Sequence, residues 1–188
     1  MTDIFKSATI TTQRLRLEPF AVHHAPSLNA INNEPQVKEF LSNNTAESIE
    51  TTCAAITRVR DRWERLGYSW WAIISRTTDS VIGAACVQNV ANKAGADLEI
   101  GWRLATASTG HGYATEAGKA VVDYAFDVIG ARHVIAVADP KNIASHRVMQ
   151  RVGMSLRGIE THYDQPCTTY VMQKPDRDSP ESRIFHRH

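Results

Sequence analysis

A glycine-punctuated turn before residue 113 carries the clearest chemical signal in the sequence. Gly110 and Gly112 stand directly before Tyr113, where a helical pattern begins. Glycines let the backbone turn sharply and approach a ligand closely, and the first N–H groups of a helix have no partner inside it. Such groups face an anion, and the helix dipole favours negative charge there. The spacing therefore predicts a phosphate cradle that a diphosphate would fit.

Other uses of a G-x-G pair compete with this interpretation. Taken alone, the pair is more often a plain turn or a helix cap than a phosphate site. A dinucleotide-binding fingerprint needs a third glycine where Thr115 stands. A phosphate loop of the Walker type needs Lys and then Ser or Thr after its last glycine, but Tyr113 and Ala114 follow Gly112. Both nucleotide-binding patterns are therefore disfavoured.

Three polar residues outside the turn could also do chemistry, and each has an ordinary structural alternative. Glu99 lies in an alternating strand pattern and could be the exposed face of a half-buried strand. Asn142 precedes a helical pattern and suits a helix N-cap. Ser145 is a small polar residue of the kind that is common in a first helical turn.

Alternation and helical periodicity predict the elements that must position these residues. In the helix after Gly112, one buried stripe is expected from Tyr113 through Val121 to Val128, and in the helix ended by Gly153, Ala144 is expected to face inward. The predicted strands span residues 14–18, 68–75, 81–90, 97–105, 133–138, 154–161 and 168–174, and the predicted helices span 49–66, 112–129 and 142–152. Asn44 or Thr45 is expected to cap the first helix, Gly67 to end it, and residues 164–166 to form the turn of a terminal hairpin.

Composition limits the class of protein. A chain of 188 residues suits one domain, here residues 1–174, followed by a polar tail at 175–188. The net charge of +1 gives no general attraction to nucleic acid or to an anionic membrane. The apolar stretches are too short to span a bilayer, and residues 1–12 lack a signal core, so a cytoplasmic protein is expected.

Metal and disulfide chemistry are not expected from the sequence. The three cysteines form no short-spaced pair and are odd in number. The histidines show no metal-ligand spacing supported by a neighbouring cysteine or carboxylate. The histidines considered are His23, His24, His133, His146 and His162.

Residues 11–174 resemble the GNAT superfamily of acetyl-CoA-dependent N-acetyltransferases in the order of their predicted strands and helices and in their motifs. Within that superfamily they most resemble the Rim-type enzymes that acetylate ribosomal-protein N-termini. The family's [Q/R]-x-x-G-x-[G/A] turn matches Gly110 and Gly112, but Ala107 departs at its lead position. The other matching phrases are T-x-R-L-x-L-x-P-F at 12–20, E-I-G-W at 99–102, G-x-G-Y-A-T-E-A at 110–117, N-x-x-S at 142–145 and V-M-Q-R-V-G-M at 148–154. The resemblance implies an α+β GNAT fold, with a mixed, mostly antiparallel sheet of about seven strands flanked by helices.

The resemblance also implies residue roles. Glu99 would be the general base that takes a proton from the acceptor amine, and Ser145 would support the departing CoA thiolate. The residues implied in acetyl-CoA binding are Trp102, Leu104, Gly110, His111, Gly112, Tyr113, Ala114 and Asn142. Met149 stands where many members have a tyrosine as general acid, so proton donation to the thiolate falls to Ser145, Tyr170 or water.

Three functions remain open at this stage. The favoured one is direct attack by an amine on acetyl-CoA, with a ribosomal or other protein N-terminus as acceptor, because an α-amino group loses its proton more readily than lysine. The alternatives are a small-molecule amine acetyltransferase, acting on an amino acid, a polyamine or an antibiotic, and a noncatalytic CoA-binding module. No contact with nucleic acid or membrane is expected, and the protein is expected to be a monomer or a homodimer.

Overall fold

Eight strands form a single sheet in the computed structural model, which describes residues 4–40 and 46–175. The strand order is β1-β2-β3-β4-β5-β6-β8-β7, and every neighbouring pair is antiparallel except β5 and β6. The mixed, mostly antiparallel sheet is confirmed, with one strand more than expected because β1 pairs briefly with β2. The strands are β1 (Ile10–Thr11), β2 (Leu15–Pro19), β3 (Trp70–Ser75), β4 (Val81–Asn89), β5 (Leu98–Leu104), β6 (His133–Ala138), β7 (Ser155–His162) and β8 (Gln165–Gln173).

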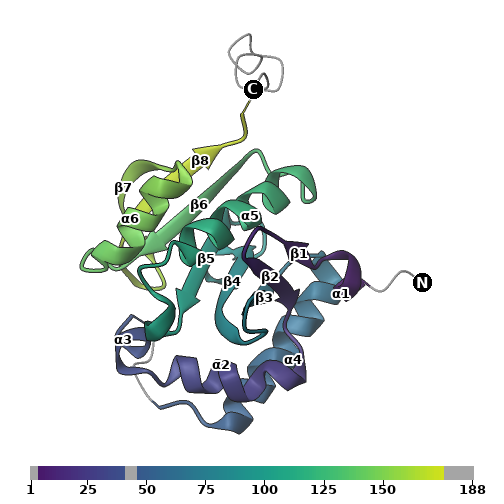
Figure 1. The fold of residues 1–188 in the computed structure, drawn as a ribbon. Coiled ribbons are helices and arrows are strands. Elements are labelled where there is room, and N and C mark those ends of the chain that lie inside the picture. The colour runs from purple at the N-terminus through teal and green to yellow at the C-terminus, as the bar shows by residue number, and fades with distance from the viewer. Residues whose placement is uncertain (1–3, 41–45, 176–188) are drawn as a thin grey trace.

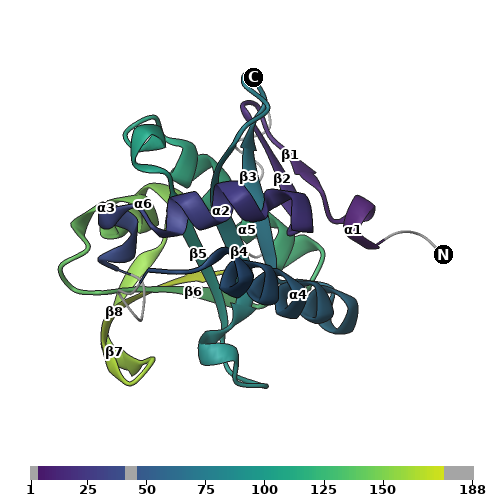
Figure 2. The same cartoon turned by 90° about the horizontal axis from the view of Figure 1, so that it is seen from below.

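Helices cover both faces of this sheet, as Figures 1 and 2 show. One face carries α5 with α6 packed beside it, and α2 lies across the other. The helices are α1 (Ile4–Ser7), α2 (Ala25–Asn32), α3 (Pro35–Lys38), α4 (Ile49–Leu66), α5 (Tyr113–Asp127) and α6 (Ile143–Val152), with the 3-10 turns η1 (Val22–His24), η2 (Val90–Asn92) and η3 (Thr106–Ser108).

The long helix α4 packs against α2. Just past its end, the Gly67 carbonyl accepts a hydrogen bond from the Tyr124 hydroxyl of α5 at 2.9 Å. Trp63 of α4 is fully buried and meets Trp71 of β3 edge to face at 4.7 Å, and Trp71 in turn meets Tyr124 of α5 at 5.1 Å. Gly67 ends the helix in the left-handed conformation, as predicted. Ser48 caps its start; the predicted caps, residues 44 and 45, lie outside the described residues.

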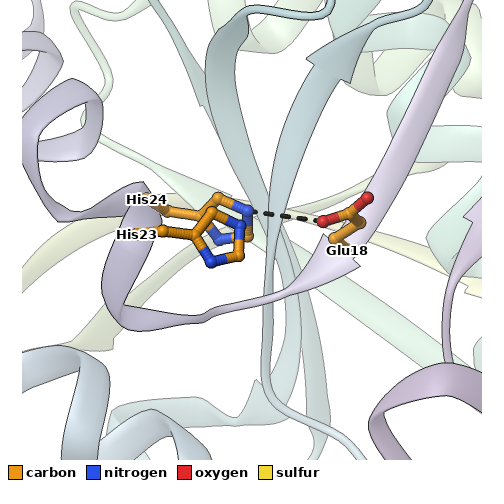
Figure 3. Close-up of side chains that lie close together, drawn as sticks. All are labelled: Glu18, His23 and His24. Carbon is orange, nitrogen blue, oxygen red and sulfur yellow. Dashed lines mark ion pairs between the residues drawn. The ribbon is translucent and has the colours of Figure 1, made fainter.

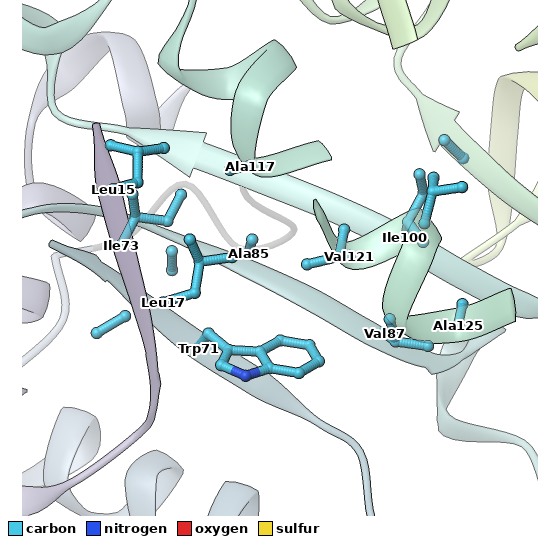
Figure 4. Packing of buried hydrophobic residues seen from close by; sticks show 14 of the residues in the cluster. Leu15, Leu17, Trp71, Ile73, Ala85, Val87, Ile100, Ala117, Val121 and Ala125 are labelled. Atoms are coloured by element: carbon cyan, nitrogen blue, oxygen red, sulfur yellow. The ribbon is translucent and has the colours of Figure 1, made fainter. Parts of the chain in front are cut away.

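Small and branched side chains beneath α5 form the centre of the core (Figure 4). Ala117, Val121 and Ala125 of this helix are fully buried against the sheet. The predicted stripe is wrong at its end, because Val128 is 65% exposed after the last turn and Phe126 is buried instead. In α6 the expected inward position of Ala144 is also wrong: that residue is exposed.

The turn of the terminal hairpin begins one residue and ends two residues earlier than predicted. Tyr163 and Asp164 form the turn, both with positive φ, whereas Gln165 and Pro166 already belong to β8. Positive φ at both central residues is the backbone of the tight turn that suits the twist of an antiparallel pair. The shift directs Tyr163 toward β5. Of the predicted polar tail, only residue 175 is described.

Candidate functional site

The parallel strands β5 and β6 meet at a single ladder pair in the described part of the chain, Glu99 with Ile135. Beyond that pair the two strands are not joined, although β5 stays paired with β4 as far as Leu104. Alternate N–H and C=O groups of β5 point away from β4 and have no ladder partner on β6. Parallel strands end at the same edge of a sheet, so the segments 105–112 and 139–142 both leave from this opening.

The turn that follows β5 wraps the start of α5, as the glycine spacing predicts. Gly110 and Gly112 adopt φ of 79° and 80°, and Gly112 is the residue that precedes the helix. The first backbone hydrogen bond of α5 runs from the Glu116 N–H to the Gly112 carbonyl at 3.0 Å. The N–H groups of residues 113–115 therefore have no intrahelical partner. A Cβ at Gly110 would meet no atom within 4 Å, so the space above the turn is open.

An ionic clamp from the segment between β1 and β2 holds this cradle in place. The Glu116 carboxylate accepts hydrogen bonds from Thr12 Oγ1 at 2.6 Å and from Arg14 Nε at 2.7 Å and backbone N at 2.8 Å. Arg14 also donates to the carbonyl of His111 at 2.9 Å and lies over the Tyr113 ring. Burial raises the pKa of Glu116, but these hydrogen bonds outweigh it and the pKa is lowered.

The sequence patterns contain these clamp residues without indicating their role. Thr12 and Arg14 open the phrase at 12–20, and Glu116 falls in the phrase at 110–117. The two phrases are about a hundred positions apart, and only the fold brings them together. A carboxylate three residues after a helix start also suits the helix dipole, which is the local signal that could have found Glu116.

Ala107 leaves the shape of the turn intact. It lies within η3, where Ser108 N–H donates to Ala105 O at 2.8 Å and Thr109 N–H to Thr106 O at 3.1 Å. Thr106 N–H donates to Glu34 Oε2 at 2.6 Å. Backbone hydrogen bonds and the side chain of Glu34, which directly precedes α3, therefore hold this segment. No side chain at position 107 is needed for its shape.

Of the remaining residues implied in cofactor binding, some pack their side chains inside the protein and others are exposed to solvent. The Trp102 ring lies against Gly118 of α5, and Leu104 is buried beside Gly83 of β4. His111 is exposed, stacks on Tyr113 at 5.8 Å, and its Nδ1 lies 2.7 Å from the Thr109 carbonyl. Trp102 and Leu104 thus use their side chains for packing, whereas their β6-facing backbone lines the opening.

Glu99 is buried rather than an exposed strand residue, since only 7% of it is accessible. Gln88 Nε2 donates to its Oε2 at 3.2 Å, and the Tyr163 hydroxyl donates to the same oxygen in a short hydrogen bond. Burial raises the pKa of Glu99, and these two hydrogen bonds oppose the rise without cancelling it. A carboxylate with a raised pKa is a better proton acceptor, which suits a general base.

Gln88 and Tyr163 are site residues that the sequence analysis missed. Gln88 lies on β4 opposite Glu99 in the ladder, and its Oε1 accepts from Trp70 Nε1 at 2.9 Å. Its Nε2 also contacts the Tyr163 hydroxyl at 3.1 Å. Antiparallel pairing of the predicted strands 81–90 and 97–105 could have placed Gln88 beside Glu99, as the ladder does. Tyr163 lies in a turn that the sequence pattern predicts further along the chain.

At the start of α6, Asn142 and Ser145 are neighbours. Asn142 Oδ1 accepts from Ser145 N–H at 3.1 Å, which confirms the N-cap. This bond uses the amide oxygen and leaves the Nδ2 donors available. The Ser145 hydroxyl makes no hydrogen bond to another described side chain or backbone group, so it is available near a helix N-terminus that favours negative charge.

Met149 is 2% exposed and belongs to the core, so a tyrosine at this position would need a different surrounding. Tyr170 is also buried, at 5%, and its hydroxyl accepts from Gln150 Nε2 at 3.3 Å while its ring lies 6.1 Å from His146. The structure therefore leaves Ser145 as the more accessible of the two predicted donors.

A second polar group, formed by Glu18, His23 and His24, has ligand atoms within 4.8 Å of one another (Figure 3). The expectation that these histidines lack a neighbouring carboxylate is therefore wrong. Ala21 N–H donates to His24 Nδ1 at 3.1 Å, so the neutral ring carries its proton on Nε2, which faces Glu18 Oε2 at 3.4 Å. A metal needs a lone pair at that nitrogen, and Arg16 already binds Glu18 Oε1 at 2.5 Å. In this hydrogen-bonded arrangement His24 therefore turns its Nε2 proton, and not a lone pair, toward Glu18.

Comparisons with known proteins agree on one family. The model described as an acetyltransferase (GNAT) domain matches residues 14–155. The chain is 24% identical over 157 residues to the uncharacterized N-acetyltransferase p20 of Bacillus licheniformis, covering 84% of this chain and 88% of that protein. It is 26% identical over 150 residues to the uncharacterized N-acetyltransferase YnaD of Bacillus subtilis, covering 80% and 84%.

Solved structures share the fold at lower sequence identity. The ribosomal-protein-S5-alanine acetyltransferase of Vibrio fischeri superposes with a TM-score of 0.76 at 12% identity, covering 90% of this chain and 98% of that one. RimL, a ribosomal L7/L12 α-N-protein acetyltransferase in complex with coenzyme A, gives 0.74 at 19% identity, covering 88% and 97%. Among the described residues, no helix is both long and apolar enough to cross a membrane. The chain belongs to the GNAT family of acetyltransferases.

Proposed function

We propose that this protein transfers an acetyl group from acetyl-CoA to a primary amine, and that its acceptor is the N-terminus of a peptide or protein. One observation carries the proposal: Glu99 sits at the single ladder pair where β5 and β6 separate. The phosphate cradle after β5 and the Asn142–Ser145 cap after β6 leave from the same opening. A base, an anion site and a thiolate donor therefore surround one gap in the sheet.

The residues at the opening suit the parts of coenzyme A. The free N–H groups of residues 113–115 and the open space above Gly110 fit a diphosphate. The unpaired backbone groups of β5 beyond Glu99 suit the amides of an extended pantetheine arm, much as a sheet edge accepts an added strand. Asn142 Nδ2 supplies a further donor beside them. Bound there, acetyl-CoA supplies the thioester.

Glu99 begins the proposed reaction by taking a proton from the acceptor ammonium, directly or through water. The neutral amine nitrogen then forms a bond to the thioester carbonyl carbon as the carbon–sulfur bond breaks. The nitrogen gives up its extra proton to solvent, so the products are an amide and a thiolate. Ser145 donates a hydrogen bond to the sulfur as negative charge develops. The thiolate leaves with a proton from solvent, and a thiol pKa of about 8.5 makes this departure feasible near neutral pH.

The choice of a peptide N-terminus rests on the number of bases. Among the described residues, Glu99 is the one buried carboxylate, and an α-amino group with a pKa of about 7.8 needs far less help than a lysine at about 10.4. Two structural neighbours, from Vibrio cholerae and Vibrio fischeri, are described as ribosomal-protein acetyltransferases, one of them putative. These names support a protein acceptor for this chain.

Release of CoA thiol from acetyl-CoA, measured with a panel of peptides, polyamines and amino acids, tests the proposal. Peptides with a free α-amino group are expected to be the best acceptors, and mass spectrometry is expected to place the acetyl group on that nitrogen. Glu99→Gln is expected to lower kcat about 10²-fold or more and Ser145→Ala about 10-fold. Faster turnover of a polyamine or amino acid would contradict the peptide acceptor, and no thiol release with any amine would favour a CoA-binding module.

A further inference from the structure

A pocket of about 650 Å³ lies between the second half of α4 and the end of β4 with η2. Three of its lining residues are Arg58, Arg62 and Arg65, which follow one another at helical spacing along one face of α4. Asp61 is the one acidic lining residue. The pocket therefore presents a surplus of positive charge on a molecule whose net charge is only +1.

The arginines of this pocket form no ion pair within the described part of the chain. None of the ion pairs found across residues 4–40 and 46–175 involves them or Asp61. Arg62 Nε donates to Ser69 Oγ at 3.1 Å, while Arg58 and Arg65 are exposed. Like charges on one helix face repel one another, so this arrangement costs stability unless an anion binds there.

Gln88 connects this pocket with the proposed base. Its side chain lines the pocket and also donates to Glu99 Oε2 at 3.2 Å. Trp70 Nε1 holds the other end of the same amide at 2.9 Å, which fixes its orientation. An acceptor whose amine lies at Glu99 would therefore extend past Gln88 toward the guanidinium groups of α4.

We propose that this pocket selects peptide acceptors with an acidic side chain close to the free N-terminus. The inference rests on the proposed function and deepens it. Guanidinium groups bind carboxylates through paired, charge-assisted hydrogen bonds, which fix geometry as well as adding attraction. A carboxylate in the first few residues would meet Arg58, Arg62 or Arg65 while the α-amine faces Glu99. The same chemistry would hold a phosphate, so a small phosphate-bearing amine is the competing source of the anion.

Three peptides that differ only at positions 2 and 3 test this inference. The acidic peptide carries Asp-Glu at these positions, the neutral one Asn-Gln and the basic one Lys-Lys. Acetyl transfer to the acidic peptide is expected to be about 10-fold more efficient in kcat/KM than to the neutral one, and less so at high salt. The double variant Arg58→Gln with Arg65→Gln is expected to remove this preference and leave transfer to the neutral peptide within twofold. Lys119→Gln with Arg132→Gln removes the same charge from exposed positions outside the pocket and is expected to keep the preference.

Calorimetric binding of the same peptides, without acetyl-CoA, separates this inference from the proposed function. Tighter binding of the acidic peptide that is lost in the Arg58 and Arg65 variant supports the pocket even if no acetyl group is transferred. Equal binding and equal transfer of acidic and neutral peptides would overturn the inference while leaving an active acetyltransferase. Phosphoethanolamine acetylated faster than the acidic peptide would also overturn it, because the anion would then belong to a small amine.

Discussion

At the residue scale, Glu99 combines burial with a charge that the proposed reaction needs. Burial raises the pKa of Glu99 in the folded protein above its value in the unfolded chain. The contribution of Glu99 to the stability of the fold is therefore fully present below the ordinary glutamate pKa of about 4.3. It is lost as pH rises through the raised pKa of the folded protein. Glu99→Gln keeps the shape and removes the charge. The variant is therefore expected to melt at a higher temperature than the parent at pH 7–8 while its kcat is lower.

Thermal melts at pH 5 and pH 8 check this prediction. The gain in melting temperature is expected to be larger at pH 8, where the parent carboxylate is charged. Gln88→Glu, which adds a second carboxylate beside the first, serves as the opposite control and is expected to lower stability at pH 8. A Glu99→Gln variant that melts below the parent at pH 8 would show that the charge stabilises the fold.

Tyr163 is expected to act on the proposed reaction through its hydrogen bond to Glu99. Its hydrogen bond opposes the rise of the Glu99 pKa, so its removal in Tyr163→Phe is expected to raise that pKa further. The acid limb of the kcat/KM profile should move to higher pH, with little loss of rate on the plateau. A pH profile measured from pH 5 to 9 checks this, and Tyr113→Phe, altered outside this network, should not move the limb. An unmoved limb in Tyr163→Phe would separate Tyr163 from the base.

Sequence reasoning finds some of these residues and not others for a physical reason. Glu99 was identified because its own strand pattern and the E-I-G-W phrase mark it locally. Tyr163 lies 64 positions away, and its contact with Glu99 depends on which residues form the turn between β7 and β8. Non-glycine residues seldom adopt positive φ, so composition placed the turn around Asp164 to Pro166 instead.

At the scale of elements, the proposed phosphate cradle is held by its clamp to the segment that precedes β2. Glu116 receives three hydrogen bonds from Thr12 and Arg14, two from Arg14 itself. Its pKa is lowered, so this contribution is present above the ordinary glutamate pKa and is lost as pH falls below it. Arg14 is 43% exposed and solvent screens the pair, so Glu116→Gln is expected to cost about 1 kcal/mol at pH 7.

The same substitution is expected to raise the KM for acetyl-CoA several-fold and to change kcat little, because the clamp positions the cradle and does not touch the reacting atoms. Steady-state kinetics with acetyl-CoA as the varied substrate measure both effects. Glu160→Gln is a matched control, since it removes a carboxylate paired with Arg157 on β7. A Glu116→Gln enzyme with unchanged KM and lowered kcat would contradict the positioning role.

Element boundaries could be predicted where the pattern is strong and local. The strand at His133–Ala138 and the glycine stops at Gly67 and Gly153 agree with the structure. Helix faces were less secure, because Val128 and Ala144 fit the period but lie at helix ends where no neighbouring element covers them. Burial at a helix end depends on packing partners, which periodicity does not contain.

At the scale of the whole molecule, the sheet brings together what no single element holds. The opening between β5 and β6 follows from their parallel pairing at one position, and strand patterns alone do not determine which strands become neighbours. The order of elements, together with the resemblance, was enough to indicate the fold. The opening explains why the ends of β5 and β6 carry the cradle and the Asn142 cap, and it predicts that one ligand should order both.

Coenzyme A is therefore expected to protect two separate segments at once. Hydrogen exchange of the amides at residues 113–115 and at the start of α6 should slow when CoA is added, while the first turn of α4, at 49–51, should be unaffected. At about 100 times its Kd, CoA should add about 2.7 kcal/mol of stability and raise the melting temperature by roughly 5–10 °C. Pantetheine lacks the diphosphate, so at the same concentration it should protect α6 weakly and the amides at 113–115 not at all. Equal protection of 113–115 by pantetheine and CoA would show that the cradle does not bind the diphosphate.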